Sequence, residues 1–114
     1  MTASSVLNIA RVSTAGLLID HGEREELVHW QRVQDISVGT MKGFSGESLF
    51  VMAIELACGR ILMCREDSGI WHELNLYVAG QLPAVVPFDA WGPALVAAPG
   101  APLVIYTFGP VGSA

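Results

Sequence analysis

The apolar positions between residues 48 and 65 follow the pattern of a β-hairpin. One apolar stretch runs from Leu49 to Leu56 and a second from Arg60 to Arg65, with the short sequence Ala57-Cys58-Gly59 between them. Two apolar stretches of strand length joined by a short glycine-containing segment are typical of an antiparallel hairpin. Both faces of the first stretch are largely apolar, so we expect a central strand that is partly covered on both sides.

From Ile70 to Leu82 the apolar positions repeat with the period of an α-helix. The repeating side chains share one stripe: Ile70, Leu74, Tyr77 and Val78, with Trp71 beside it. We expect Asp67 or Ser68 to cap the start of this helix and Gly80 to end it. The hairpin therefore passes directly into a helix whose apolar stripe covers the sheet.

The rest of the chain shows shorter strand patterns and one more helix. Strands are predicted at Val6–Val12, Leu17–Ile19, Glu26–Trp30, Val33–Thr40 and Leu103–Phe108. The third and fourth of these form either one bent strand or two. A second, shorter helix is predicted at Phe88–Ala97, capped by Asp89. Residues 1–5 and 109–114 are expected to be frayed tails.

These elements predict an α+β fold with a strongly twisted antiparallel sheet of about six or seven strands. One main helix and a short second helix are expected to pack on it. The 114 residues suit a single domain that spans residues 1–114. Two separate cores of half that size would each be only marginally stable.

Composition restricts the classes of partner. Hydrophobic residues make up 52% of the chain and charged residues only 15%, against about 25% charged in an average domain. So few charges leave apolar surface uncovered, which predicts a homo-oligomer, most simply a dimer, or an unidentified protein partner. The net charge of −5 disfavours nucleic acid and anionic membrane surfaces, because both require a basic patch.

The two cysteines, Cys58 and Cys64, are expected to be free thiols. A two-residue turn in the hairpin pairs Leu56 with Ile61. The same register pairs Ala53 with Cys64, several residues from the turn that holds Cys58, too far for a disulfide.

Free thiols favour a cytoplasmic location. The N-terminus also lacks the basic region and apolar core of a signal peptide, and no stretch is long and apolar enough to span a membrane.

No residue pattern indicates a catalytic, cofactor-binding or metal-binding site. His29, His72 and Cys64 would have to converge in space to bind a metal, and nothing in their spacing requires this. The adjacent carboxylates of Glu66 and Asp67 precede a predicted helix, where acidic residues usually favour the positive end of the helix dipole. No cofactor is therefore predicted.

The three tryptophans are the strongest candidates for a binding surface. Trp30, Trp71 and Trp91 combine a large apolar area with a polar N–H group, a combination enriched at interaction sites. They could line one groove, and the alternative is that they pack in the core. Together with Leu49 and Val51 on the outer face of the central strand, they form the predicted interaction surface.

The order of landmarks from Trp30 to Phe108 resembles that of small bacterial proteins with a pleckstrin-homology-like fold. The matching segments are Trp30-x-x-Val33-x-x-Ile36, the hairpin from Phe50 to Arg65, Ile70-Trp71-x-x-Leu74, Leu82-Pro83, Phe88-Asp89-x-Trp91 and Val104-x-Tyr106. The resemblance implies a strongly bent sheet but no transferable activity. Phosphoinositide-binding members of that fold use basic loops, whereas the loop from Met41 to Gly46 offers only Lys42.

These observations predict a non-catalytic protein-interaction module of a bacterial cytoplasmic protein. The alternative is binding of a small apolar ligand between the sheet and a helix, and the third possibility is an enzyme of unknown class. A flat apolar patch would favour the interaction module and a continuous apolar cavity would favour the ligand. A deep cleft with coupled histidine and carboxylate groups would favour an enzyme.

Overall fold

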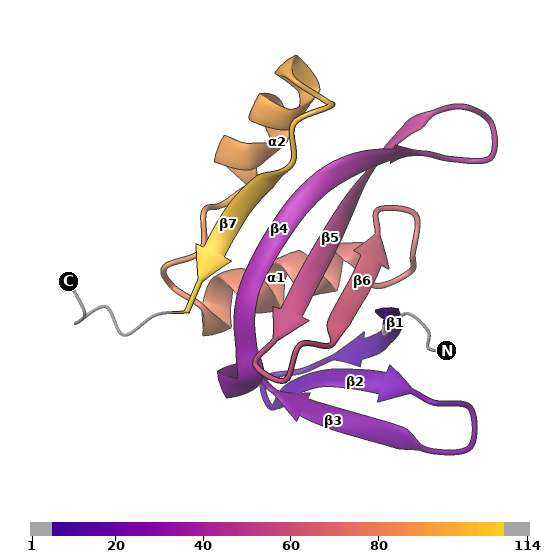
Figure 1. Cartoon of the computed structure of the whole chain (residues 1–114), viewed down its shortest axis with the longest axis vertical. Coiled ribbons are helices and arrows are strands. Elements are labelled where there is room, and N and C mark those ends of the chain that lie inside the picture. The colour runs from indigo at the N-terminus through magenta and orange to yellow at the C-terminus, as the bar shows by residue number, and fades with distance from the viewer. Residues whose placement is uncertain (1–5, 109–114) are drawn as a thin grey trace.

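Seven strands form one mixed sheet in the computed structural model, which describes residues 6–108 (Figure 1). The strands are β1 (Val6–Val12), β2 (Gly16–Asp20), β3 (Glu25–His29), β4 (Val33–Lys42), β5 (Ser48–Leu56), β6 (Ile61–Arg65) and β7 (Leu103–Thr107). They lie in the order β3-β2-β1-β6-β5-β4-β7. The predicted tails at residues 1–5 and 109–114 lie outside the described residues.

The predicted α+β class and the number of strands are confirmed. The pairing between β1 and β6 is parallel, with Leu7 opposite Leu62, and the other five pairings in the sheet are antiparallel. β3 and β4 are two strands, separated by a 3₁₀ turn at Trp30–Arg32. The sheet is open, with β3 and β7 at its edges, an arrangement consistent with a pleckstrin-homology-like fold.

Two helices, α1 (Trp71–Gln81) and α2 (Phe88–Ala97), contribute to one core on a single face of the central strands. In Figure 1, α1 runs behind β4, β5 and β6. The predicted stripe of α1 is confirmed, because Leu74 and Val78 are buried and its other members pack against the core. On β5, Met52 and Ile54 point to the same core, whereas the alternate residues point to the opposite face.

The predicted register of the β5–β6 hairpin is wrong by one residue. Ile61 lies opposite Glu55, and Ala53 lies opposite Met63. The turn has three residues rather than two, because Leu56 donates its N–H to the carbonyl of Arg60. A three-residue turn needs a residue with positive φ, which Gly59 supplies with φ of +96°. Cys58 and Cys64 are free, as predicted.

The start of α1 also differs from the prediction. Its N-cap is Ile70, which makes no side-chain capping bond. Asp67 instead accepts two hydrogen bonds from Arg65, at 2.6 and 3.0 Å. The hydroxyl of Ser68 lies 3.2 Å from the sulfur of Cys64. Both residues predicted to cap α1 therefore interact with side chains of β6 instead, because the segment before the helix is a turn packed on that strand.

The other helix ends were predicted less accurately than the helices themselves. α1 continues through Gly80 and ends after Gln81, so Gly80 does not terminate it. The N-cap of α2 is Pro87 rather than Asp89, which lies within the first turn. There the carboxylate of Asp89 still interacts favourably with the positive end of the helix dipole.

Candidate functional site

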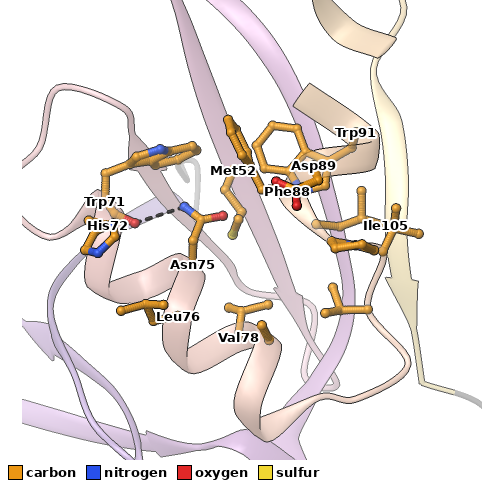
Figure 2. A pocket seen from close by; sticks show the side chains of 14 residues that line it. Met52, Trp71, His72, Asn75, Leu76, Val78, Phe88, Asp89, Trp91 and Ile105 are labelled. Atoms are coloured by element: carbon orange, nitrogen blue, oxygen red, sulfur yellow. Dashed lines mark hydrogen bonds between the residues drawn. The ribbon is translucent and has the colours of Figure 1, made fainter. Parts of the chain in front are cut away.

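A cleft of about 460 Å³ lies where α1, α2 and the segment 82–87 that joins them meet the sheet (Figure 2). Its volume falls within the range of about 300–1,000 Å³ that is usual for small-molecule sites. Its apolar lining comes from Met52, Trp71, Leu76, Val78, Ala79, Val85, Val86, Pro87, Phe88, Trp91 and Ile105. His72, Asn75 and Asp89 complete the lining. The cleft is thus mostly apolar with a few polar groups.

One side of the cleft is a wall of aromatic rings, formed by Trp71, Phe88 and Trp91. The ring centroids of Phe88 and Trp91 are 4.7 Å apart, and those of Trp71 and Trp91 are 6.3 Å apart. Phe50 supports this aromatic wall from the sheet, with its ring 5.4 Å from that of Trp91. All of these pairs are edge-to-face, which is a favourable arrangement for aromatic side chains. The rings therefore hold one another in place.

Local helix geometry positions the wall. Phe88 and Trp91 are three residues apart on α2, so they lie on the same side of the helix. Trp71 is the first residue of α1, and its carbonyl accepts a hydrogen bond of 2.9 Å from the side chain of Asn75 one turn later. Figure 2 shows this bond at the edge of the cleft.

A β-bulge in β7 gives Ile105 its position at the cleft. Ile36 of β4 lies opposite Tyr106, whereas the next residue, Ser37, lies opposite Val104. Ile105 is therefore an extra residue on β7, and a bulge of this kind changes the direction of a side chain. Ile105 is 3% exposed and belongs to the core cluster.

The predicted interaction residues fall into three places. Trp71 and Trp91 meet in the aromatic wall. Trp30 is buried away from the cleft, and its indole N–H donates a hydrogen bond of 2.9 Å to a backbone carbonyl of the β1–β2 turn. Leu49 and Val51 belong to the sheet face opposite the helices, where Leu49 is buried and Val51 is half-buried. Their role in binding stays a prediction.

A polar cluster that the sequence did not predict lies between β3 and the β5–β6 turn. Arg60 donates two hydrogen bonds to the carboxylate of Glu26, at 2.8 and 2.9 Å, and His21 lies 2.9 Å from the same carboxylate. The hydrogen bonds from Arg60 and, to a smaller extent, from His21 lower the pKa of Glu26 from 4.5 to about 2. Hydrogen bonds from the backbone and side chain of Arg60 also lower the pKa of the exposed Cys58 thiol. No local pattern in the sequence links Glu26 to Arg60, since the two residues are 34 positions apart.

The residues considered for a metal site do not converge. His29 lies on β3, where its ring nitrogen is 3.3 Å from the carbonyl of Ala15. His72 is on α1 at the cleft, and Cys64 on β6 contacts Ser68. Within residues 6–108, no three histidine, cysteine or acidic side chains form a group that could hold a metal ion.

Comparison with protein-family models, curated proteins and solved structures finds no match to this chain. Its function must therefore be inferred from the geometry of its own residues. Neither α1 nor α2, the helices of the described part of the chain, is long and apolar enough to cross a membrane.

Proposed function

We propose that the protein binds a small apolar molecule in the cleft between α1 and α2. The observation that carries this proposal is a cleft of about 460 Å³ lined mainly by apolar side chains from both helices and the sheet. Such a lining excludes well-hydrated molecules, because their polar groups would lose water without gaining partners. A molecule with a largely apolar body would instead gain free energy from its burial.

The rim of the cleft supports the same function. Leu76 is 59% exposed, Phe88 44% and Val86 38%, although all three are large apolar residues. Neighbouring exposed apolar groups around a concavity are typical of ligand sites. A bound molecule would cover part of this rim and remove it from water.

Titration with the neutral fluorophore N-phenyl-1-naphthylamine tests the proposal. Its emission should increase on binding and saturate at one molecule per chain. Ala79→Phe, which places a ring in the cleft, should weaken binding by roughly tenfold or more, the effect of losing about 1.4 kcal/mol. Ala94→Phe is the matched control, because Ala94 is exposed on α2 outside the cleft. Equal binding by both variants would contradict the proposal.

A second candidate function is protein interaction through the sheet face opposite the helices. Strand alternation places a set of apolar side chains on this outer face: Met41, Leu49, Val51, Ala53 and Met63. Among the described residues, these five lie outside the buried core cluster. They are also absent from the partly buried residues that pack against that cluster. Apolar residues on a sheet face generally pack against another layer.

We propose a second copy of the chain as the partner on the outer face. The small residues Ser37 and Gly39 lie beside Ala53 and Val51, so two sheets can approach to the usual separation of about 10 Å. The β3 edge of the sheet suits pairing less well. β3 is short and carries Glu25 and Glu26, and charged residues at an edge disfavour strand addition.

Sedimentation velocity across a concentration series tests this dimer. Val51→Lys should shift the protein to the monomer, because a two-fold contact would bury the unpaired charge twice. Val96→Lys is the matched control, since Val96 is 71% exposed on α2, away from the outer face. A wild-type protein that stays monomeric at high micromolar concentration would exclude the dimer.

A further inference from the structure

We infer that the cleft selects an apolar molecule with a positively charged end, such as an alkylammonium ion, over an anion with the same apolar body. This inference rests on the proposed function of the cleft as a small-molecule site. It specifies the chemical class of the ligand, which the volume of the cleft alone leaves open.

The charges at the cleft have one sign. Among the 14 lining residues, Asp89 is the one acidic residue, and lysine and arginine are absent. No ion pair or side-chain hydrogen bond within residues 6–108 uses the carboxylate of Asp89. A carboxylate or phosphate ligand would find no lysine or arginine side chain here, and His72 is the one lining residue able to become cationic. The formal net charge of −5 adds a general attraction for cations.

The aromatic wall favours the same class of ligand. The faces of tryptophan and phenylalanine rings carry partial negative charge, and cations bind to them within about 6 Å of the ring centre. Trp71, Phe88 and Trp91 line the same cleft as Asp89. An ammonium group at the cleft could therefore contact a ring and the carboxylate together.

The start of α2 could in principle attract an anion instead, because the positive end of a helix dipole is there. That end corresponds to about half an elementary charge, whereas Asp89 in the first turn carries a full negative charge. The backbone N–H groups of Ala90 and Trp91 both donate to the carbonyl of Pro87. These two N–H groups are thus already engaged, which leaves those of Phe88 and Asp89 for an anion. The full charge of the Asp89 carboxylate exceeds the partial charge of the helix end, so the local balance favours a cation.

Three probes with one alkyl body test the inference: octyltrimethylammonium, 1-octanol and nonanoate. Their affinities are measured by displacement of N-phenyl-1-naphthylamine from the wild-type protein. We expect the cation to bind on the order of tenfold more tightly than the anion, the combined effect of one exposed ion pair and one cation–π contact. The alcohol should lie between them.

Substitution of Asp89 identifies the source of the preference. Asp89→Asn should reduce the cation-to-anion affinity ratio several-fold. Glu73→Gln removes the same charge from the exposed surface of α1 outside the cleft, so it should leave the ratio within about twofold. If Asp89→Asn does not fold, the ratio for the wild type at 0.5 M NaCl should fall instead, because salt screens exposed charges.

The outcomes separate this inference from the function on which it rests. If the alcohol binds but the cation binds no better than the anion, the selectivity is wrong while the apolar site stands. A cation preference that neither Asp89→Asn nor salt reduces would also overturn the role of Asp89. If the fluorophore itself does not bind the wild-type protein, the proposed function fails. If it binds but none of the three probes displaces it, the inference about the charged end fails while the apolar site stands.

Discussion

The backbone N–H of Val86 donates a hydrogen bond to the carbonyl oxygen of Ile105, with an N···O distance of 2.9 Å. Val86 lies in the segment that joins the two helices, whereas Ile105 is the bulged residue of β7. Both residues line the cleft. This one bond therefore attaches the connecting segment to the sheet and occupies a carbonyl at the edge of β7.

Because of this bond, the Val86 amide should be protected from hydrogen exchange although the residue is 38% exposed. Native-state exchange followed by NMR checks this. We expect the Val86 amide to exchange at a rate close to that of the amides of β7. Exchange at the rate of an unprotected amide would mean that the connecting segment moves independently of the sheet.

The packing of α1 on the sheet predicts a large effect of Leu74→Ala. Leu74 is 0% exposed, so its truncation should lower the free energy of unfolding by about 2–5 kcal/mol. Leu76→Ala on the same helix is the control, because Leu76 is 59% exposed and should change stability by no more than about 0.5 kcal/mol. Urea unfolding measures both. Similar values for the two variants would contradict the observed orientation of α1.

The ion pair between Glu26 and Arg60 predicts a specific pH dependence of stability. The pKa of Glu26 is lowered from 4.5 to about 2 in the folded protein. As pH falls between these values, the unfolded chain takes up a proton before the folded one, so the stabilisation from Glu26 is progressively lost. Glu26 is about a third exposed, and solvent screening keeps this contribution small.

Glu26→Gln should therefore lose less stability than the wild type between pH 5 and pH 2. Urea unfolding at several pH values in this range measures the difference. Glu25→Gln is the matched control, since Glu25 is the neighbouring residue and pairs with Arg11 at the surface. Parallel stability curves for the wild type and Glu26→Gln would show that the Arg60 pair does not form.

The two cysteines should react at different rates. Cys58 is exposed, and hydrogen bonds from Arg60 lower its pKa. Cys64 is buried, and burial raises its pKa. Because the thiolate is the reactive form, a disulfide reagent should modify one thiol quickly in the native protein and the second only on unfolding. Arg60→Gln should slow the first reaction, and a stoichiometric intramolecular disulfide would contradict the prediction.

Local patterns in the sequence were enough to predict which segments form strands and helices. The sequence pattern predicted β1 and α2 with the bounds that the structure has, Val6–Val12 and Phe88–Ala97. It also identified the buried stripe of α1, including Leu74 and Val78. These features depend on residues a few positions apart, and the period of the backbone alone relates such residues to one another.

How the strands and helices meet depends on contacts that form only in the folded protein. The hairpin register depended on whether the turn has two or three residues, which the positive φ of Gly59 and the Leu56–Arg60 hydrogen bond set. The cleft required contacts between Trp71 and Trp91 from different helices. Such contacts join segments distant in the chain, and they form only when the whole core packs. No local pattern in the sequence encodes these long-range contacts, because which side chains meet depends on how all the buried side chains pack together.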